Sequence, residues 1–523
     1  MSAMIYRKSM KKEEVNIVWF KRDLRFTDNE PFYFAQQSNL PLLLVYVFEP
    51  SVMSNIDSDV RHWRFVHESL LEMNLKLKNL SAEIFIFHQE TTLVFEELTK
   101  LYQINTVFSS QEIGNGLTYA RDKQMKIFFD QHQIKWSEFQ TNGIVRRLKT
   151  RRDWEKLWKI QMTSSPKIVN EHDWNIISIN VLDFNRIKGV ELPTVITHRD
   201  KNFQQGGEYW AWRYLDDFIK QRHVNYSKHI SKPLLSRTGC SRLSPYLTYG
   251  NISMRMIYQF TLQKYETALN KRALSNFISR LHWHCHFIQK FEDEPRYETE
   301  NVNRAFDALV KPRKTEFIDA FEHGNTGVPI IDASMRCLKA TGYINFRMRA
   351  MVVSFFVFNL WQDWRDLHFL ARYFLDYEPG IHYPQLQMQS GTTGVNTVRI
   401  YNPIKNSHEH DADGLFIKKW VPELVNVPLE FIHEPHKMSS IEKQLYACEI
   451  GVNYPFPIVD VEETRKHASA IVWSFRRNPD VKLEGKRILE KHVNTKKKSS
   501  KKIKKVEPKS NAKIVTTYQT RLL

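Results

Sequence analysis

Short, continuous apolar runs recur along the first quarter of the chain, and longer mixed stretches separate them. The runs are rich in β-branched and aromatic residues, whereas the stretches between them place apolar residues at helical spacing. Continuous apolar strands that alternate with helices are typical of a parallel sheet covered on both faces. We therefore predict an α/β domain with a doubly wound, Rossmann-like parallel sheet over residues 14–142. The predicted strands are 15–20, 40–48, 82–87 and 105–108, and the predicted helices include 60–80 and 91–102.

The pattern changes after residue 200, where helical periodicity dominates. Residues 143–200 carry many charges and few strand-like runs, which indicates a long inter-domain connector on the surface. We predict an all-helical second domain over residues 201–480. Residues 481–523 form a basic, lysine-rich tail that we expect to be disordered, because its composition cannot build a core. The predicted helices of the second domain are 208–222, 254–269, 274–291, 331–340 and 347–364.

The composition indicates a globular protein with an excess of positive charge. Lys and Arg number 76 against 58 Asp and Glu, which gives a formal net charge of +18. Nine of the lysines lie between Lys496 and Lys513 with Glu507, so the rest of the chain still carries about +10. Such an excess favours a polyanion as partner, because cationic side chains neutralise phosphates and release counterions. Colloidal solubility is the alternative explanation.

Other sequence features indicate the cellular compartment in which we expect the protein. No apolar run reaches the roughly 18 residues that a membrane-spanning helix needs, and the N-terminus has no apolar signal-peptide core. We therefore expect a soluble, cytoplasmic protein with no membrane partner. The four cysteines are far apart and form no C-x-x-C pair, so we expect buried free thiols and no metal site.

Five motifs together resemble the photolyase/cryptochrome family. They are V-W-F-K-R-D-L-R-F-T-D-N (18–29), G-C-S-R-L-S-P-Y-L-T-Y-G (239–250), T-G-V-P-I-I-D-A-S-M (326–335), the run 343–378 and R-I-Y-N-P (399–403). The resemblance covers about residues 14–480 and is to bacterial-type members with a non-standard electron-transfer chain. It implies an N-terminal antenna domain and a helical, FAD-binding catalytic domain that uses light.

The second motif is similar to the family's clasp for the FAD phosphates. Small hydroxyl side chains and free backbone N–H groups at a turn into a helix suit a pyrophosphate. Taken without the resemblance, the same residues would be an ordinary loop and helix cap. The resemblance implies that the phosphate contacts are made by Tyr226, Cys240, Ser241, Arg242, Leu243 and Ser244.

The resemblance also assigns residues around the flavin ring. Arg349 and Asp376 align with an Arg–Asp pair that the family places against the ring, where a cation stabilises negative charge on reduced flavin. Asp376-Tyr377-Glu378 replaces the usual Asp-x-Asp. His382 falls where the family commonly has Asn opposite flavin N5, with Tyr383 as the alternative. We hypothesise that an imidazole there makes flavin protonation sensitive to pH.

The electron-transfer residues depart from the family's pattern. Many relatives reduce the flavin through three tryptophans that begin with W-Q-W, and here that place reads Leu386-Gln-Met388. Trp364 fits the middle position, and we predict that it takes part in catalysis. No tryptophan fits the outermost position. Another hopping route could use Trp361, Tyr373, Tyr377 and Tyr383, although each is also explained as a core aromatic residue.

The segment 279–287 aligns with the helix that meets the damaged bases. Trp283 matches the family's dimer-stacking tryptophan, Arg280 replaces a Glu or Gln, and His284 is expected near the cofactor or the DNA backbone. A metal held by His282, His284 and His286 is disfavoured, because alternate residues of a helix point to different faces. The predicted DNA-contacting residues are Arg280, Trp283, Phe346, Arg347, Met388 and Asn406.

Further departures from the family's pattern bear on the type of DNA lesion and on the antenna chromophore. Relatives that repair (6-4) photoproducts use two histidines in the region 345–350, where this chain has Phe346 and Ala350, so we favour cyclobutane dimers. The segment 111–122 corresponds to the antenna site. Thr118 takes the place of the glutamate that holds a folate, and folate, deazaflavin, another flavin or an empty cleft remain open.

The resemblance therefore implies a deoxyribodipyrimidine photolyase, a carbon–carbon lyase. Excited FADH⁻ would donate an electron to a flipped pyrimidine dimer in UV-damaged DNA. The alternative is a cryptochrome-type blue-light receptor without repair activity, which Leu386, Met388 and Arg280 favour somewhat. The third hypothesis is a DNA-binding member of the family that no longer binds flavin. We expect the protein to be a monomer.

Overall fold

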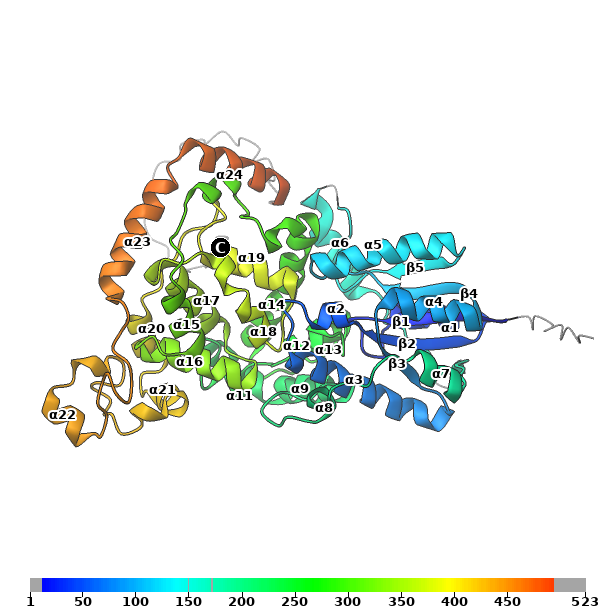
Figure 1. Cartoon of the computed structure of the whole chain (residues 1–523), viewed down its shortest axis with the longest axis horizontal. Helices are drawn as coiled ribbons and strands as arrows, with labels where there is room; N and C mark the ends of the chain where they lie inside the picture. Colours follow the sequence, from blue (N-terminus) through cyan, green and yellow to red (C-terminus); the bar gives the residue numbers. More distant parts are fainter. Residues whose placement is uncertain (1–11, 149, 171–172, 493–523) are drawn as a thin grey trace, which may run out of the picture.

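The N-terminal part of the computed structural model is a five-stranded parallel sheet in the order β3-β2-β1-β4-β5 (Figure 1). The structure describes residues 12–148, 150–170 and 173–492. The order places β1 at the centre, and helices cover both faces, so the predicted doubly wound α/β fold is confirmed. The strands are β1 (Glu13–Phe20), β2 (Leu42–Phe48), β3 (Ile84–His88), β4 (Tyr102–Ser110) and β5 (Lys135–Phe139).

The two faces of the sheet are covered by different helices. One face packs against α4 (Thr91–Leu101), α5 (Gly116–Gln131) and α7 (Val181–Ile187), and the other packs against α1 (Glu30–Gln36) and α3 (Val60–Leu77). Helix α7 belongs to the predicted connector, and its Phe184 ring lies 5.0 Å from the Phe85 ring. The connector also contains α6 (Trp154–Thr163) and α8 (Thr194–Thr197).

Strand β5 was not predicted from the sequence. Its residues Lys-Trp-Ser-Glu-Phe contain no continuous apolar run, because an edge strand is only partly buried. It pairs with β4 alone, from Thr106 opposite Lys135 to Ser110 opposite Phe139.

The second part of the chain is helical. No helix among the described residues is long and apolar enough to cross a membrane. The longer helices are α9 (Glu208–Lys220), α13 (Met254–Gln263), α14 (Lys271–Asp293), α15 (Thr315–His323), α16 (Pro329–Thr341), α17 (Phe346–Ser354), α19 (Pro379–Gln389), α20 (Pro403–His410), α23 (Val461–Phe475) and α24 (Pro479–His492). The short ones include α2 (Pro50–Met53), α10 (Tyr226–His229), α11 (Ser236–Gly239), α12 (Ser244–Thr248), α18 (Phe369–Tyr373), α21 (Leu415–Trp420) and α22 (Ser440–Leu445).

The single helix predicted over 347–364 is broken. Helix α17 ends at Ser354 and is followed by one π-helical turn, η7 (Phe355–Asn359). Trp361 then has a φ of +55°, in the left-handed region that a helix cannot contain. Trp364 begins a separate 3₁₀ turn, η8 (Trp364–Leu367). Apolar residues continue through the break because the whole segment is buried, so the pattern alone did not reveal it.

The first residues of the predicted tail are helical. Helix α24 continues to His492 and buries Val481 and Ile488, whereas the sequence suggested disorder from residue 481. The end of the helix is held by a polar contact, because the carboxylate of Glu294 lies 3.0 Å from His492 Nε2. The lysine-rich residues 493–523 lie outside the described part of the chain.

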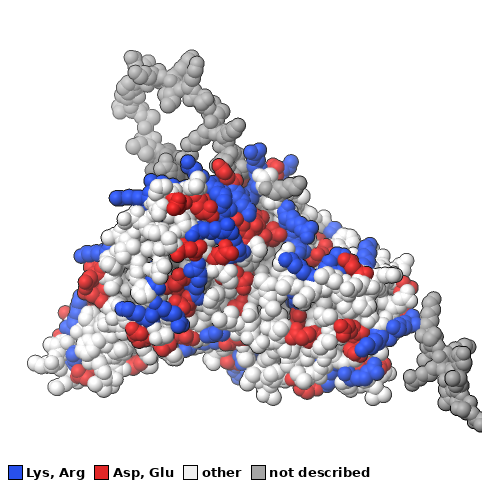
Figure 2. Space-filling view, turned by 45° about the horizontal axis from the view of Figure 1, so that its top comes forward, with Lys and Arg blue, Asp and Glu red and all other residues white. Residues whose placement is uncertain are grey.

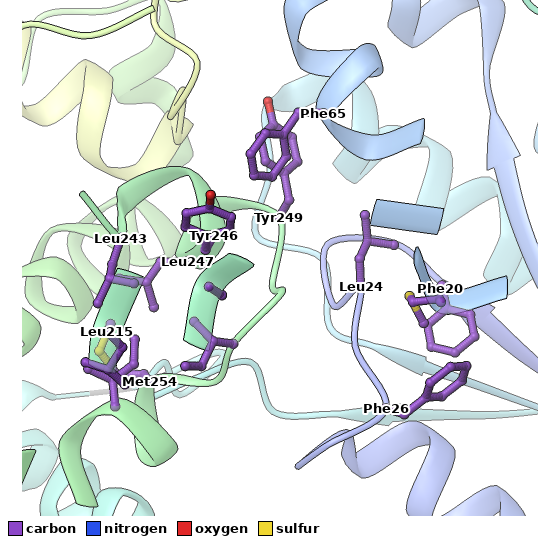
Figure 3. Packing of buried hydrophobic residues seen from close by; sticks show 14 of the residues in the cluster. Phe20, Leu24, Phe26, Phe65, Leu215, Leu243, Tyr246, Leu247, Tyr249 and Met254 are labelled. Carbon is purple, nitrogen blue, oxygen red and sulfur yellow. The ribbon is translucent and has the colours of Figure 1, made fainter. Parts of the chain in front are cut away.

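The loop after β1 joins the sheet domain to the helical domain. Leu24 N–H donates to the Tyr249 carbonyl oxygen at 3.1 Å, and Arg25 Nη1 donates to the Gly250 carbonyl oxygen at 2.7 Å. Figure 3 shows Phe20, Leu24 and Phe26 on one side of this interface and Tyr246 to Met254 on the other. Asp23, on the same loop, accepts a hydrogen bond from the Ser110 hydroxyl at 2.7 Å.

Candidate functional site

An arginine–carboxylate pair forms one wall of the predicted flavin pocket. Arg349 Nη2, on α17, donates to both oxygens of Asp376 at 2.9 and 2.8 Å. Its Nε donates to the Ile344 carbonyl oxygen, and its guanidinium lies 4.0 Å from the centre of the Phe374 ring. These contacts fix a cation that can stabilise negative charge on a ring placed beside it. The pair that the sequence predicted is therefore formed.

Two imidazole nitrogens near this pair have no partner among the described residues. They are Nδ1 of His284, on α14, and Nε2 of His382, on α19, and both atoms are buried. The two helices pack against each other. A buried polar nitrogen without a hydrogen bond is costly, so the pocket fits a bound group that offers polar atoms to both rings. The isoalloxazine and adenine rings of FAD carry such atoms.

Burial keeps both imidazoles neutral. It lowers the pKa of His284 to about 4, with Arg22 adding to the shift, and it lowers the pKa of His382 to about 3, with Arg349 adding to the shift. A ring with a pKa near 3 does not change its protonation between about pH 5.5 and 8. The hypothesis that His382 makes the flavin site sensitive to pH is therefore not supported by the structure.

The predicted phosphate clasp lies between α11 and α12. Arg242 has a φ of +59°, and its guanidinium is turned inward, 3.6 Å from the centre of the Tyr343 ring, with Nη2 donating to Gln204 Oε1 at 2.7 Å. Leu243 caps α12 with its backbone only, which leaves N–H groups of the first turn for a ligand. Arg242 therefore shapes the loop, and sequence reasoning missed the Gln204 and Tyr343 contacts.

The remaining clasp residues differ in accessibility. Ser241 and Ser244 are partly exposed, whereas Tyr226 and Cys240 are buried. Burial raises the pKa of the Cys240 thiol to about 11, so the thiol stays protonated at neutral pH. Burial also raises the pKa of Tyr226, and the neighbouring Arg280 opposes that shift. These residues can offer hydroxyl and backbone groups to a phosphate.

Two residues assigned to the flavin ring have partners in the other domain. Glu378 Oε2 lies 2.6 Å from Arg22 Nη2, and the Tyr377 hydroxyl donates to Asp57 Oδ2 at 2.6 Å. The structure therefore places both side chains at the domain interface. Whether they also contact a flavin stays a prediction. Only the folded arrangement brings Asp57 to this place, and its sequence neighbourhood gave no signal.

A second cleft opens at this interface, at the carboxyl ends of β1, β2 and β4. It encloses about 840 Å³, part of it open to solvent, and Thr118 of the predicted antenna segment lines it. Crevices at this edge of a parallel sheet commonly bind ligands. Arg121 lies in its wall, with Nη2 2.8 Å from Glu112 Oε2. Other lining residues are Trp19, Lys21, Tyr46, Glu49, Asp57, His62 and Tyr377.

Two histidines of α14 share one helix face, since the rings of His282 and His286 lie 5.1 and 5.9 Å from the Trp154 ring. The His282 ring lies 4.9 Å from that of Trp158, and His286 Nδ1 accepts a hydrogen bond from Arg151 Nη2 at 3.2 Å. His284 instead lies within the electrostatic influence of Arg22 and Asp376. The three rings therefore do not converge on one point.

Four of the residues predicted to meet DNA lie in the middle of α14 and at the start of α17. Trp283 is partly exposed, with its ring 5.1 Å from that of His286, and Arg280 is exposed. Phe346 is 48% exposed at the start of α17, and Arg347 Nη1 donates to the Tyr401 hydroxyl at 3.3 Å. These side chains are available to a ligand, and their role stays a prediction.

The other two residues predicted to contact DNA differ in accessibility. Met388 is partly exposed on α19, as Trp283 is on α14. Asn406 is buried, and its Nδ2 donates to the carbonyl oxygen of Asn402, the N-cap of α20, at 2.8 Å. This bond uses one of the two Nδ2 hydrogens, so burial limits a contact between Asn406 and DNA more than the bond does.

The tryptophans predicted to carry electrons have different environments. Trp364 is 2% exposed, and its Nε1 donates to Asn301 Oδ1 at 2.8 Å. The Trp361 ring lies 4.5 Å from Lys311 Nζ. A cation beside a ring opposes the loss of an electron from it. The Trp364 ring also has a cation beside it, since the Arg365 guanidinium lies 5.4 Å from its centre. The two tryptophans therefore differ in burial and not in the presence of a cation.

Comparison with known proteins gives consistent matches to both parts of the chain. Residues 16–159 match the family model described as DNA photolyase, and residues 277–474 match the FAD binding domain of DNA photolyase. Together these matches cover more than half of the chain.

Curated relatives match nearly the whole length. The chain is 26% identical to the deoxyribodipyrimidine photo-lyase of Alkalihalophilus pseudofirmus, covering 87% of this chain and 97% of that protein. It is 25% identical to the cryptochrome DASH of Gloeobacter violaceus, covering 87% and 95%. A crystal structure of a bacterial class III photolyase from Agrobacterium tumefaciens superposes with a TM-score of 0.74 at 23% identity, covering 90% of this chain and 100% of that one.

Proposed function

Because the chain belongs to the photolyase/cryptochrome family, we propose that it repairs cyclobutane pyrimidine dimers in DNA with bound FAD and light. FAD, when reduced and excited by light, supplies the electron that splits the cyclobutane ring and takes it back afterwards. The protein's own part is to hold the cofactor, admit a flipped dinucleotide and exclude water.

The observation that carries the proposal is the arrangement of α14. His284 has a buried nitrogen without a partner among the described residues and lies within the electrostatic influence of Asp376, while Trp283 is partly exposed on the same helix. One helix thus carries both the histidine that we propose faces the cofactor and the tryptophan that we propose stacks on the lesion. A base that stacks on Trp283 would lie close to the cofactor, and stacking on aromatic rings tolerates any base sequence.

The surface charge supports DNA as the partner. Lysine and arginine side chains gather across the upper part of the face in Figure 2, with acidic side chains between them. The formal net charge of +18 includes the lysines of residues 493–523. Positive charge of this size favours phosphate binding and makes it dependent on salt.

The test is illumination of a dimer-bearing oligonucleotide with purified protein whose flavin has been reduced chemically. We expect light-dependent loss of dimers from single- or double-stranded DNA and no loss in the dark. An undamaged oligonucleotide and Trp283→Ala protein serve as controls. No repair by protein that holds reduced flavin and binds the DNA would contradict the proposal.

The second candidate is a cryptochrome-type blue-light receptor. The observation in its favour is that Leu386 and Met388 stand where many relatives have tryptophans, and a cryptochrome DASH is among the relatives. This candidate predicts flavin photoreduction without dimer splitting in the same experiment.

We also propose that the 840 Å³ cleft at the carboxyl ends of β1, β2 and β4 holds the antenna chromophore. Its aromatic lining, which includes Trp19, Tyr46 and Tyr377, suits a planar ring system, and folate, deazaflavin and flavin all contain one. Extraction of the purified protein followed by mass spectrometry of the released chromophores distinguishes the three.

A further inference from the structure

A hydrogen-bonded chain of two tyrosines and a carboxylate connects the flavin pocket with the second cleft. The hydroxyl oxygens of Tyr383 and Tyr377 lie 3.2 Å apart, and the Tyr377 hydroxyl donates to Asp57 Oδ2 at 2.6 Å. Tyr383 is 1% exposed. Because the single hydroxyl hydrogen of Tyr377 is directed to the carboxylate, Tyr383 supplies the hydrogen for the bond between the two phenols.

The flavin end of this chain is His382. Its ring centre lies 5.3 Å from those of both Tyr377 and Tyr383. His382 also lies within the electrostatic influence of Arg349 and Asp376, which wall the flavin pocket. His382 therefore contacts both tyrosines and is close to the Arg349–Asp376 pair, beside which the flavin is proposed to bind.

The other end is a carboxylate built to accept a proton. Asp57 is 3% exposed, and its oxygens accept hydrogen bonds from Asn55 Nδ2 at 2.7 Å and from Asn115 Nδ2 at 2.8 Å. Both donors are neutral amides, which hold the carboxylate in place without supplying a positive charge. A carboxylate held at hydrogen-bond distance from a phenol is placed to act as its base.

Resting on the proposed function, we infer that Tyr377 and Tyr383 form a proton-coupled electron donor to the photoexcited, oxidised flavin, with Asp57 as proton acceptor. The flavin gains one electron, and Tyr377, directly or through Tyr383, loses one. The O–H bond of Tyr377 breaks as an O–H bond forms on Asp57 Oδ2, which leaves a neutral tyrosyl radical. In the dark, the electron returns from the flavin and the proton from Asp57.

The surroundings explain why the proton must move with the electron. Burial, together with Tyr383 and Asp57, raises the pKa of Tyr377 well above its ordinary value, so the phenol is protonated at neutral pH. A phenol that has lost an electron becomes a strong acid, and transfer of its proton to Asp57 traps the radical. The route also supplies a donor in a chain where Leu386 and Met388 replace two tryptophans.

The test uses the purified holoprotein with oxidised flavin, excited directly with blue light. Time-resolved absorption and electron paramagnetic resonance should detect a neutral tyrosyl radical in the wild-type protein, with slower formation in D₂O. The radical signal should be lost in Tyr377→Phe, and Asp57→Asn should lose both the stable radical and the D₂O effect. Asp57→Asn also serves if Tyr377→Phe does not fold, because it keeps a group of the same shape.

Tyr454→Phe is the matched control, because the Tyr454 hydroxyl also donates to a buried carboxylate, Asp332 Oδ2, at 2.5 Å. It should keep the wild-type radical signal. The inference is overturned if Tyr377→Phe and Asp57→Asn bind flavin and retain the wild-type radical, rate and isotope effect. Chemically reduced protein does not need this donor to repair dimers. Failure of the repair assay would therefore contradict the proposed function, whereas the radical experiment tests the tyrosine donor.

Discussion

Arg22 Nη2 lies 2.6 Å from Glu378 Oε2 and joins the loop after β1 to the start of α19. Arg22 Nε also donates to the Thr248 carbonyl oxygen at 3.1 Å. Burial raises the pKa of Glu378, and Arg22 counteracts that shift by stabilising the ionised carboxylate. This one ion pair therefore ties the sheet domain to the helix that supplies His382, Tyr383 and Met388.

Removing the cation should weaken the fold. We expect Arg22→Ala to lower the free energy of unfolding by about 1.5–3 kcal/mol, because it leaves Glu378 buried without its charged donor. Urea denaturation at pH 7 measures the change. Arg465→Ala is the control, since Arg465 pairs with Glu462 at 2.7 Å on the surface, where solvent screens the attraction and the pair contributes little to stability. Equal losses from the two variants would contradict the structural role given to Arg22.

The Arg349–Asp376 pair should hold the cofactor. We expect Arg349→Ala to weaken FAD binding about 10- to 150-fold, which corresponds to the loss of a charged hydrogen bond of about 1.5–3 kcal/mol. Flavin fluorescence titration of the apoprotein measures the dissociation constant. Arg336→Ala is matched to it, because Arg336 Nη1 donates to both Glu423 oxygens at 2.8 Å outside the pocket. Unchanged FAD affinity in Arg349→Ala would remove this pair from the site.

The protonation of His382 should not control photoreduction at neutral pH. Burial lowers its folded-state pKa to about 3, so the ring is neutral throughout the range from about pH 5.5 to 8. We expect the pH profiles of flavin photoreduction to run parallel in the wild type and in His382→Asn over this range. A step near pH 6.5 in the wild type that His382→Asn abolishes would show that the bound cofactor restores an ordinary pKa.

The same shift has a consequence for stability. Because the pKa of His382 is lower in the folded than in the unfolded state, its protonation favours unfolding as the pH falls below about 6.5. When the pH is lowered from 8 to 5.5, the wild type should therefore lose more stability than His382→Asn, which has no imidazole at this position to protonate. Thermal melting of both proteins at the two pH values measures the losses.

Trp283 should contribute to lesion binding without affecting the flavin. Stacking of a base on an aromatic ring contributes about 1–3 kcal/mol, so we expect Trp283→Ala to bind dimer-bearing single-stranded DNA about 5- to 150-fold more weakly. Fluorescence anisotropy measures the affinity, and absorbance measures the flavin content. Trp473→Ala, which removes a tryptophan 47% exposed on α23, should leave the affinity unchanged. Equal affinities for Trp283→Ala and wild type would exclude the stacking role.

The two tryptophans near η8 should differ in their effect on photoreduction. We expect Trp364→Phe to slow it, because the buried Trp364 ring fits the family's middle electron carrier. Trp361→Phe should leave the rate unchanged, because Trp361 matches none of the family's three tryptophan positions. Laser-flash kinetics on both variants compares them. A wild-type rate in Trp364→Phe would remove Trp364 from the route.

Much of the fold could be predicted because its elements have local signals. Continuous apolar runs identified four strands, and helical periodicity identified the segment that forms α14 within a few residues at each end. The missed strand β5 and the unexpected helix α24 have weaker patterns, since each buries only part of its surface. The break after Ser354 was missed because a fully buried segment is apolar whatever its backbone conformation.

The candidate site also contains some contacts that the sequence predicts and others that it does not. The Arg349–Asp376 pair was predictable from the motif that carries both residues. The partners of Glu378 and Tyr377 were not, since Arg22 and Asp57 lie in the other domain. The Tyr377–Asp57 hydrogen bond joins residues 320 positions apart, and nothing in either local sequence indicates the other.

The sequence alone determined the family, the order of the sheet and helical parts and the FAD-binding segment, because each rests on residues that are close together in the chain. The tertiary structure decided which side chains meet across the domain interface. It placed Tyr377 against Asp57, turned Arg242 inward onto Tyr343 and left His284 and His382 without hydrogen-bond partners among the described residues. The physical reason is that burial and pairing between distant residues depend on how the two domains dock, which local periodicity does not encode.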